Sequence, residues 1–195
     1  MKTTMKNGIR QAMKRSAEIS TCGQFRWWLQ RRWADGPLVC FVMLNPSVAD
    51  AEQDDPTIRR CIAFARAWGF GALSVRNLFP YLATKPADLK RAMKSIDVTG
   101  GQRGLGELAV AATADLVIAA WGANATECAA QRFYAVTASK PLWCIDTTLE
   151  GKPVHPLYQA ADKQPKAFLR CDGKVWTDAL DHEEKILRSA AAADV

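Results

Sequence analysis

The sequence predicts an α/β protein with three layers, α/β/α, around a central, mainly parallel four-stranded sheet. Apolar, strand-like runs alternate with amphipathic helical segments between residues 38 and 146, and this alternation is typical of βαβ units. The chain has 195 residues, of which 49% are hydrophobic and 24% charged, which is enough for one domain with a sizeable core. We find no internal repeat and no second domain.

The first core strand and the helix after it have the clearest signals. Residues 38–44, LVCFVML, are continuously apolar, as expected of a strand that is covered on both faces. Asp55 stands at the N-cap of the next helix and Pro56 at its first position, where a missing N–H costs nothing. Apolar residues then recur at helical spacing and form the face expected to contact the core: Ile58, Cys61, Ile62, Ala65 and Trp68.

The remaining core elements continue the alternation. Gly69 and Gly71 end the first helix, and the glycines between residues 100 and 106 predict a flexible connection. Right-handed crossovers between parallel strands place helices on both faces of a sheet. The predicted elements, in chain order, are a strand at 72–79, a short helix around 86–94, a helix at 105–112, a strand at 114–122, a helix at 126–138 and a strand at 141–146.

The ends of the chain are predicted to lie outside this core. Residues 1–19 are expected to form a basic, flexible N-terminal arm, and residues 20–195 the single domain, with a C-terminal hairpin and helix across 166–193.

The stretch FRWWLQRRW, residues 25–33, mixes aromatic and basic residues, as nucleic-acid surfaces do. We favour a structural interpretation, in which it is an amphipathic strand or helix that packs its tryptophans onto the core: Trp27, Trp28 and Trp33.

The net charge and the cysteine content limit the kinds of partner, metal and cofactor that the sequence predicts. The net charge of +6 favours polyanions such as nucleic acid, although much of the excess lies in the first 32 residues. The cysteines include no C-x-x-C pair, so neither a zinc ribbon nor an iron–sulfur spacing is present, and we expect no cofactor and no metal. No run reaches the ~18 apolar residues of a membrane span. The sequence therefore predicts a cytoplasmic protein with reduced cysteines and no membrane partner.

Polar signatures follow the predicted strands. Ligands of open parallel sheets bind beyond the carboxyl ends of the strands. Taken singly, each signature has a structural explanation, since Asn-Pro starts turns and a histidine between prolines is commonly a loop residue. Their shared location nevertheless predicts a site. In chain order they are Asn45-Pro46-Ser47, Asn77, Trp121-Gly122 and His155-Pro156-Leu157-Tyr158.

The same motifs carry two resemblances. The stretch FVMLNPSVADAEQDDPTIRRCIAFARAWGFGALSVRNLF, with CGQFRWWLQRRW before it and AAWG and GKPVHPLY after it, resembles the domain-of-unknown-function family 1643 over about residues 20 to 160. More distantly, MLNPS, VRNLFPYLAT, AAWGANA and VHPLY resemble, in order, the motifs of the uracil-DNA glycosylase superfamily.

The second resemblance implies a uracil-DNA-glycosylase-like fold and a nucleobase- or nucleotide-directed enzyme, most concretely one that hydrolyses or transfers at an N-glycosidic bond in DNA or a nucleotide, in DNA modification or repair. By this resemblance Asn45 positions water, Asn77 reads the base and His155 stabilises the departing base. The implied substrate-binding residues are Pro46, Ser47, Phe79, Tyr81, Trp121, Gly122, Leu157 and Tyr158.

The sequence departs from that pattern in ways that keep alternatives open. An amide cannot act as a general base, so catalysis would draw on Asp54 or Asp55. The acidic segment around residues 50–55 would repel a duplex and favours a nucleotide or free base. One alternative is a catalytically inactive module that binds a modified base or nucleotide. Another is a metal-dependent phosphodiester enzyme that uses Asp50, Asp54 and Asp55.

Overall fold

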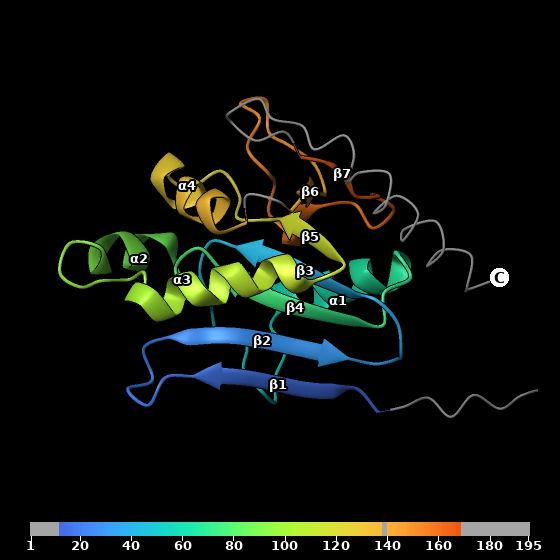
Figure 1. Ribbon diagram of the computed structural model, residues 1–195, viewed down its shortest axis with the longest axis horizontal. Helices are drawn as coiled ribbons and strands as arrows, with labels where there is room; N and C mark the ends of the chain where they lie inside the picture. The colour runs from blue at the N-terminus through green and yellow to red at the C-terminus, as the bar shows by residue number, and fades with distance from the viewer. Residues whose placement is uncertain (1–11, 138–139, 169–195) are drawn as a thin grey trace, which may run out of the picture.

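A computed structural model describes residues 12–137 and 140–168 and shows a mixed α/β fold built on one seven-stranded sheet (Figure 1). The strand order is β1-β2-β4-β3-β5-β6-β7. Strands β4, β3, β5 and β6 run parallel and form the predicted centre. The strand bounds are Lys14–Ile19 (β1), Arg26–Arg32 (β2), Leu38–Met43 (β3), Ala72–Asn77 (β4), Leu116–Ala119 (β5), Trp143–Cys144 (β6) and Lys166–Ala167 (β7).

The sheet is wider than predicted, because antiparallel strands extend both of its edges. Strands β1 and β2 pair with each other, and β2 pairs with β4, while β7 pairs with β6. The prediction of a flexible arm is therefore wrong for Lys14–Ile19, where β1 gains backbone hydrogen bonds from β2. Basic residues are common on edge strands, because their charge discourages the edge from pairing with other chains. Residues 1–11, and most of the predicted C-terminal hairpin and helix, lie outside the described residues.

The helices cover both faces of the sheet. Helix α1 (Pro56–Ala67) begins where predicted, and the carboxylate of Asp55 accepts a hydrogen bond from the Ile58 N–H at 2.8 Å. Its buried residues pack with alternate residues of the central strands in one core, and α2, α3 and α4 pack over the opposite face in a second core. The bounds of these three helices are Pro86–Ala92 (α2), Gly101–Val110 (α3) and Glu127–Val136 (α4).

The glycine-rich connection is helical, which corrects the sequence prediction. Helix α3 starts at Gly101, earlier than the predicted residue 105, and includes Gly104 and Gly106. A Cβ atom on Gly104 would lie 1.9 Å from the carbonyl oxygen of Thr99. This glycine is therefore required by the close approach of backbone to helix and not by flexibility.

The aromatic-basic stretch forms β2, but two of its arginines, Arg26 and Arg31, lie inside, whereas Arg32 is exposed and the tryptophans are only half-buried. Arg26 is 1% exposed and Arg31 0% exposed. The ring of Trp27 stacks on Phe25 at 5.3 Å between centroids, and the Arg103 guanidinium lies over it at 4.8 Å. The prediction of tryptophans packed onto the core is confirmed for Trp33, which packs against the core that contains α1, and is wrong for Trp27 and Trp28. The reason is that backbone carbonyls in loop 49–53 accept hydrogen bonds from the arginines and satisfy them inside the protein.

The buried cysteines behave as small hydrophobic residues. Burial raises the pKa of Cys40 to about 11 and that of Cys144 to about 12, so both thiols are protonated at neutral pH. Cys61 is buried too, whereas Cys22 and Cys128 are exposed. Within the described residues, no helix is long and apolar enough to cross a membrane.

Candidate functional site

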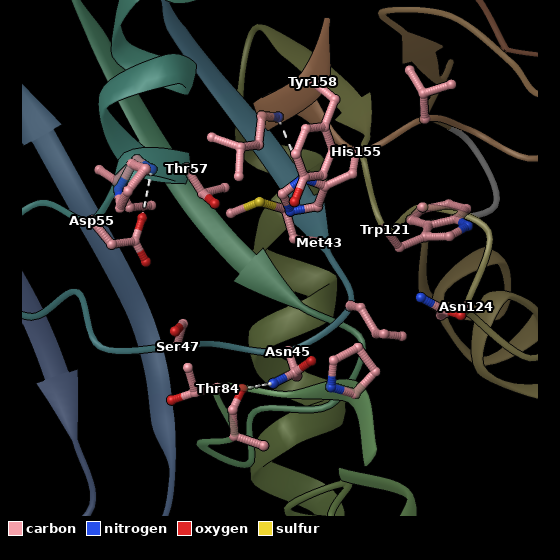
Figure 2. A pocket seen from close by; sticks show the side chains of 18 of the residues that line it. Met43, Asn45, Ser47, Asp55, Thr57, Thr84, Trp121, Asn124, His155 and Tyr158 are labelled. Atoms are coloured by element: carbon pink, nitrogen blue, oxygen red, sulfur yellow. Dashed lines mark hydrogen bonds between the residues drawn. The ribbon is translucent and has the colours of Figure 1, made fainter. Parts of the chain in front are cut away.

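A cavity of about 680 Å³ opens at the carboxyl edge of the central strands. Four parts of the chain supply most of its wall: the residues after β3, the first turn of α1, the residues after β5, and segment 148–158. Figure 2 shows that side chains from these distant segments, among them Asn45, Asp55, Trp121 and His155, surround a common space. The size suits a small organic ligand.

Many of the residues predicted for the site line this cavity, and several do not. The lining includes Asn45, Ser47, Asp55, Trp121, Gly122, His155, Leu157 and Tyr158. The predicted residues that are not among the lining are Pro46, Asp54, Asn77, Phe79 and Tyr81.

Asn45 follows β3 and is held with its amide in one orientation. Its Nδ2 donates to the carbonyl oxygens of Ala83 and Pro46, at 2.6 and 3.0 Å. Only the NH₂ end of an amide can donate to a carbonyl, so these two contacts identify Oδ1 as the other end. In Figure 2, the oxygen of the Asn45 amide lies on the side opposite the dashed hydrogen bond. Asn45 therefore offers the cavity an acceptor that is suited to hold a water or a ligand N–H.

His155 is arranged as a neutral hydrogen-bond donor. Its Nδ1 accepts a hydrogen bond from the Leu157 N–H at 3.3 Å, so a neutral ring carries its proton on Nε2. Burial lowers the pKa of His155, and the negative charge of Asp55 opposes that change only in part. At neutral pH the imidazole is thus uncharged, with Nε2–H as its donor.

Gly122 lies beside the histidine loop in a backbone conformation that favours glycine. It adopts φ +74°, in the left-handed region that favours glycine, and a Cβ there would sit 3.5 Å from the His155 Cβ. Next to it, Trp121 is 4% exposed and packs edge-on against Phe133 at 5.8 Å between ring centroids. The wall on this side of the cavity is therefore aromatic and tightly packed.

Asp55 combines a structural contact with a place in the cavity wall. One oxygen, Oδ1, caps α1 through the Ile58 N–H. Within the described residues, the other oxygen makes no hydrogen bond. Burial lowers the pKa of both His155 and Arg26, and the negative charge of this carboxylate opposes that change in each of them. Asp55 is the carboxylate best placed to take part in chemistry there.

Asp54, in contrast, is turned away from the cavity. Its carboxylate accepts from the Nε of Arg31 at 2.7 Å and lies 3.6 Å from the Arg15 guanidinium. Arg31 also donates to the backbone carbonyls of Asp50 and Gln53. Asp54 thus stabilises a buried arginine and ties loop 49–55 to β2.

Replacing Asp54 by Asn is expected to lower the free energy of unfolding by about 3 kcal/mol, because the buried Arg31 would lose its charge partner. Any catalytic rate should stay within about twofold, since Asp54 is outside the cavity wall. Urea denaturation and steady-state kinetics of the variant check both statements. A large drop in rate with unchanged stability would show that Asp54 takes part in catalysis.

Asn77 reaches the cavity only through Arg26. It ends β4 beside Met43 and is 5% exposed, and its Oδ1 accepts from the Nη2 of Arg26 at 3.3 Å. Phe79 packs in the core beneath α2, α3 and α4, and Tyr81 packs edge-on against Phe25. The aromatic side chains of the cavity wall are instead Trp121 and Tyr158.

Arg26 is the site residue that sequence reasoning missed. Arg26 lines the cavity although it comes from β2. An amphipathic strand with its tryptophans on the core would have placed its basic residues toward solvent. The only sequence signal was its place at the start of the aromatic-basic stretch. Thr57, Thr84 and Asn124 also line the cavity, and no motif singled them out.

The three aspartates of the acidic segment 50–55 have separate roles. Asp50 accepts hydrogen bonds from the Glu52 and Gln53 N–H groups, Asp54 pairs with Arg31, and Asp55 caps α1. The part of the chain that the structure describes contains no group of three or more His, Cys, Asp or Glu residues that could hold a metal ion. The arrangement therefore gives the metal-dependent interpretation no ligand set there.

The segment that carries His155 is fastened to α1. Trp68, after the end of α1, donates from Nε1 to the Lys163 carbonyl oxygen at 2.9 Å, and Arg60 donates to the carbonyl oxygen of Gln159. Asp146, shortly after β6, forms ion pairs with Lys163 and Lys166 at the other end of this segment. These contacts fix the histidine loop against the helix whose first turn bears Asp55.

Comparison with known proteins adds a family but no activity. No curated protein and no solved structure matches the chain. The family described as "Protein of unknown function (DUF1643)" matches residues 26–157, from Arg26 at the start of β2 to Leu157 in the cavity wall. Since the match covers more than half of the 195 residues, the chain belongs to the DUF1643 family.

Proposed function

We propose that this protein is a nucleobase- or nucleotide-directed hydrolase that cleaves an N-glycosidic bond. The observation that carries the proposal is that one cavity brings together a neutral imidazole donor, an amide oxygen and a carboxylate: His155, Asn45 and Asp55. The ordered resemblance to uracil-DNA glycosylase motifs supports it, since two of these residues, Asn45 and His155, belong to those motifs. Fold likeness alone would not suffice.

Each of the three groups suits one requirement of the reaction. Water attacks the anomeric carbon while the C–N bond breaks and its electron pair passes to the base. Asp55 accepts the proton of the water, and Asn45 orients that water through Oδ1. His155 donates from Nε2 to the base as negative charge accumulates there, a type of contact worth about 3–4 kcal/mol in other enzymes. The base then takes up a proton, and the products are a free base and a sugar with a hydroxyl group at the anomeric carbon.

The direct test is base release by the purified protein. Substrates would include oligonucleotides with uracil, mismatched or modified bases, together with nucleosides and mononucleotides, and chromatography would quantify the free base. We expect release from at least one substrate and its dependence on Asp55 and His155. A folded wild-type protein that releases no base from any of them would contradict the hydrolase proposal.

Replacing His155 by Ala is expected to lower kcat by about 10²–10³-fold with little change in KM, because the donor acts on charge that develops in the transition state. His155→Gln should recover part of the loss, since its amide offers an N–H donor at a similar reach. Equal rates for wild type and His155→Ala would remove the histidine from the mechanism.

The pH dependence of stability provides a structural control for these variants. Burial lowers the pKa of His155 in the folded state, so the unfolded state takes up the proton first as the pH falls. The stability tied to the neutral ring is full above the ordinary pKa of about 6.5 and is lost as the pH drops through the lowered value. Urea denaturation in steps from pH 7.5 to values below the ordinary pKa of about 6.5 should show a decline that is smaller in His155→Gln.

One observation favours a second candidate, a binding module without turnover. Among the described residues that line the cavity, Asp55 is the only carboxylate, and one of its oxygens is committed to α1. Substituting Asn45 by Ala separates the two functions. A catalyst would lose rate and keep most of its affinity, whereas a module would bind without any turnover to lose.

A further inference from the structure

Arg26 is a buried cation that has no counterion among residues 12–137 and 140–168. It is 1% exposed, yet it lines the cavity. Its Nη1 donates to the Ala49 carbonyl oxygen at 2.8 Å and its Nη2 to Asn77 at 3.3 Å, and both acceptors are neutral. Within the described residues, its Nε has no hydrogen-bond partner and no carboxylate pairs with it. A guanidinium in this setting keeps donors and most of a positive charge available.

The neighbouring groups leave that charge uncompensated. Burial lowers the pKa of Arg26 to about 10, which still leaves the group charged at neutral pH. Asp55 and Asp50 act on it from a distance, but neither forms an ion pair with it. The Nδ2 of Asn77 is likewise buried without a partner, so a second orphan donor lies on the residue that Arg26 contacts.

Arg31 shows what a fully paired arginine looks like in the same strand. It is 0% exposed, and it forms a charge pair with Asp54 while donating to several backbone carbonyls. It is not part of the cavity wall. Buried charges are normally paired in this manner, because an unpaired one costs free energy. The difference between the two arginines is that the unpaired one faces the ligand space.

We infer that Arg26 binds an oxyanion group of the ligand, either the phosphate of a mononucleotide or a carboxylate on the heterocycle. The inference rests on the proposed function for the nature of the heterocycle. It deepens that proposal by assigning an anionic, free small molecule to the cavity. A phosphate in duplex DNA lies on the outside of a helix and does not reach an arginine that is 1% exposed.

The site discriminates between ligands by charge. Pairing with the guanidinium compensates a charge that is buried in the free protein, so an anionic ligand gains a charge-assisted hydrogen bond that its neutral counterpart lacks. Asp55, half-buried in the same wall, repels any anion placed beside it, so the contact with the guanidinium must outweigh that repulsion.

Matched ligand pairs test the inference without any turnover. Isothermal titration calorimetry would compare 5′-mononucleotides with their nucleosides, and orotate with uracil, and orthophosphate would be added as a competitor. The anionic member of at least one pair should bind about 10- to 100-fold tighter, and orthophosphate should weaken its binding. Preference for the mononucleotide identifies phosphate, and preference for orotate identifies carboxylate. Equal affinity within both pairs, or no binding of any anion, overturns the inference.

Variants of the two arginines supply the control. Arg26→Lys should reduce the preference for the anionic ligand about tenfold, because a lysine lacks the planar guanidinium donors, and Arg26→Met should abolish it. Arg31→Lys, at a comparably buried position of β2, should leave the preference unchanged. If the Arg26 variants fail to fold, the wild-type ligand pairs still decide.

The outcome is separable from that of the proposed function. If the protein prefers anionic ligands but releases no base, the hydrolase proposal fails and the oxyanion site stands. Base release with equal affinity for anionic and neutral ligands removes the oxyanion site alone.

Discussion

Asp55→Asn is expected to lower kcat for base release by roughly 10²–10⁴-fold, the loss typical of a missing general base. An asparagine can still cap α1, since Asn and Asp are about equally good N-cap residues, so the free energy of unfolding should change by less than about 1 kcal/mol. The substitution removes the ability to accept a proton and keeps the side-chain oxygen that bonds the Ile58 N–H. Single-turnover kinetics and urea denaturation measure the two effects.

Two further variants separate the cap from the chemistry. Asp55→Ala removes both and should add a stability loss of about 1 kcal/mol to the loss of rate. Thr126 caps α4 through the Ala129 N–H and lies outside the cavity wall, so Thr126→Ala should cost similar stability and leave the rate unchanged. If Asp55→Asn is fully active, the water must be deprotonated by another group and the assignment of the base fails.

Gly104→Ala is expected to destabilise the protein by at least about 3 kcal/mol. The added Cβ would lie 1.9 Å from the Thr99 carbonyl oxygen and 3.0 Å from its carbonyl carbon, and backbone atoms cannot rotate away as a flexible side chain can. Helix α3 would have to move off the loop before it. For a chain of this size the midpoint of thermal unfolding should fall by roughly 6–12 °C.

Gly106 in the same helix is the matched control. A Cβ there meets nothing within 4 Å, so Gly106→Ala should stabilise the protein by about 0.5–1 kcal/mol through helix propensity alone. Opposite signs for the two substitutions, measured by calorimetry, would confirm that close packing selects Gly104. Two stabilising substitutions would show that α3 tolerates displacement and that the tight contact with Thr99 is unimportant.

The elements that the sequence predicted well are those with local signals. An uninterrupted apolar run rich in strand-forming residues identified β3, because such a run is typical of a strand buried on both faces. The Asp55-Pro56 pair placed the start of α1 to the residue, since capping depends on neighbouring residues only. The cavity lies at the carboxyl edge of the parallel strands, where the topology alone suggests a site.

The elements that the sequence did not predict depend on distant partners. Strand β1 is charged and only becomes a strand because β2 offers its backbone groups. Arg26 and Arg31 are buried because the chain some 20 residues later folds back and presents carbonyl oxygens to them. Gly104 resembled a flexible residue until the position of Thr99 was known. Amino-acid composition and hydrophobic periodicity do not indicate contacts between residues that are distant in the chain.

The fastening of the histidine loop to α1 has a consequence for biosynthesis. The contacts between Trp68 and Lys163 and between Arg60 and Gln159 join residues separated by more than ninety positions in the chain. A ribosome-bound chain that has emerged only as far as β6 already contains Asp55 and Asn45 but still lacks His155. The cavity wall can therefore be complete only after the chain has been synthesised through Tyr158, the last residue in the sequence among those that line it.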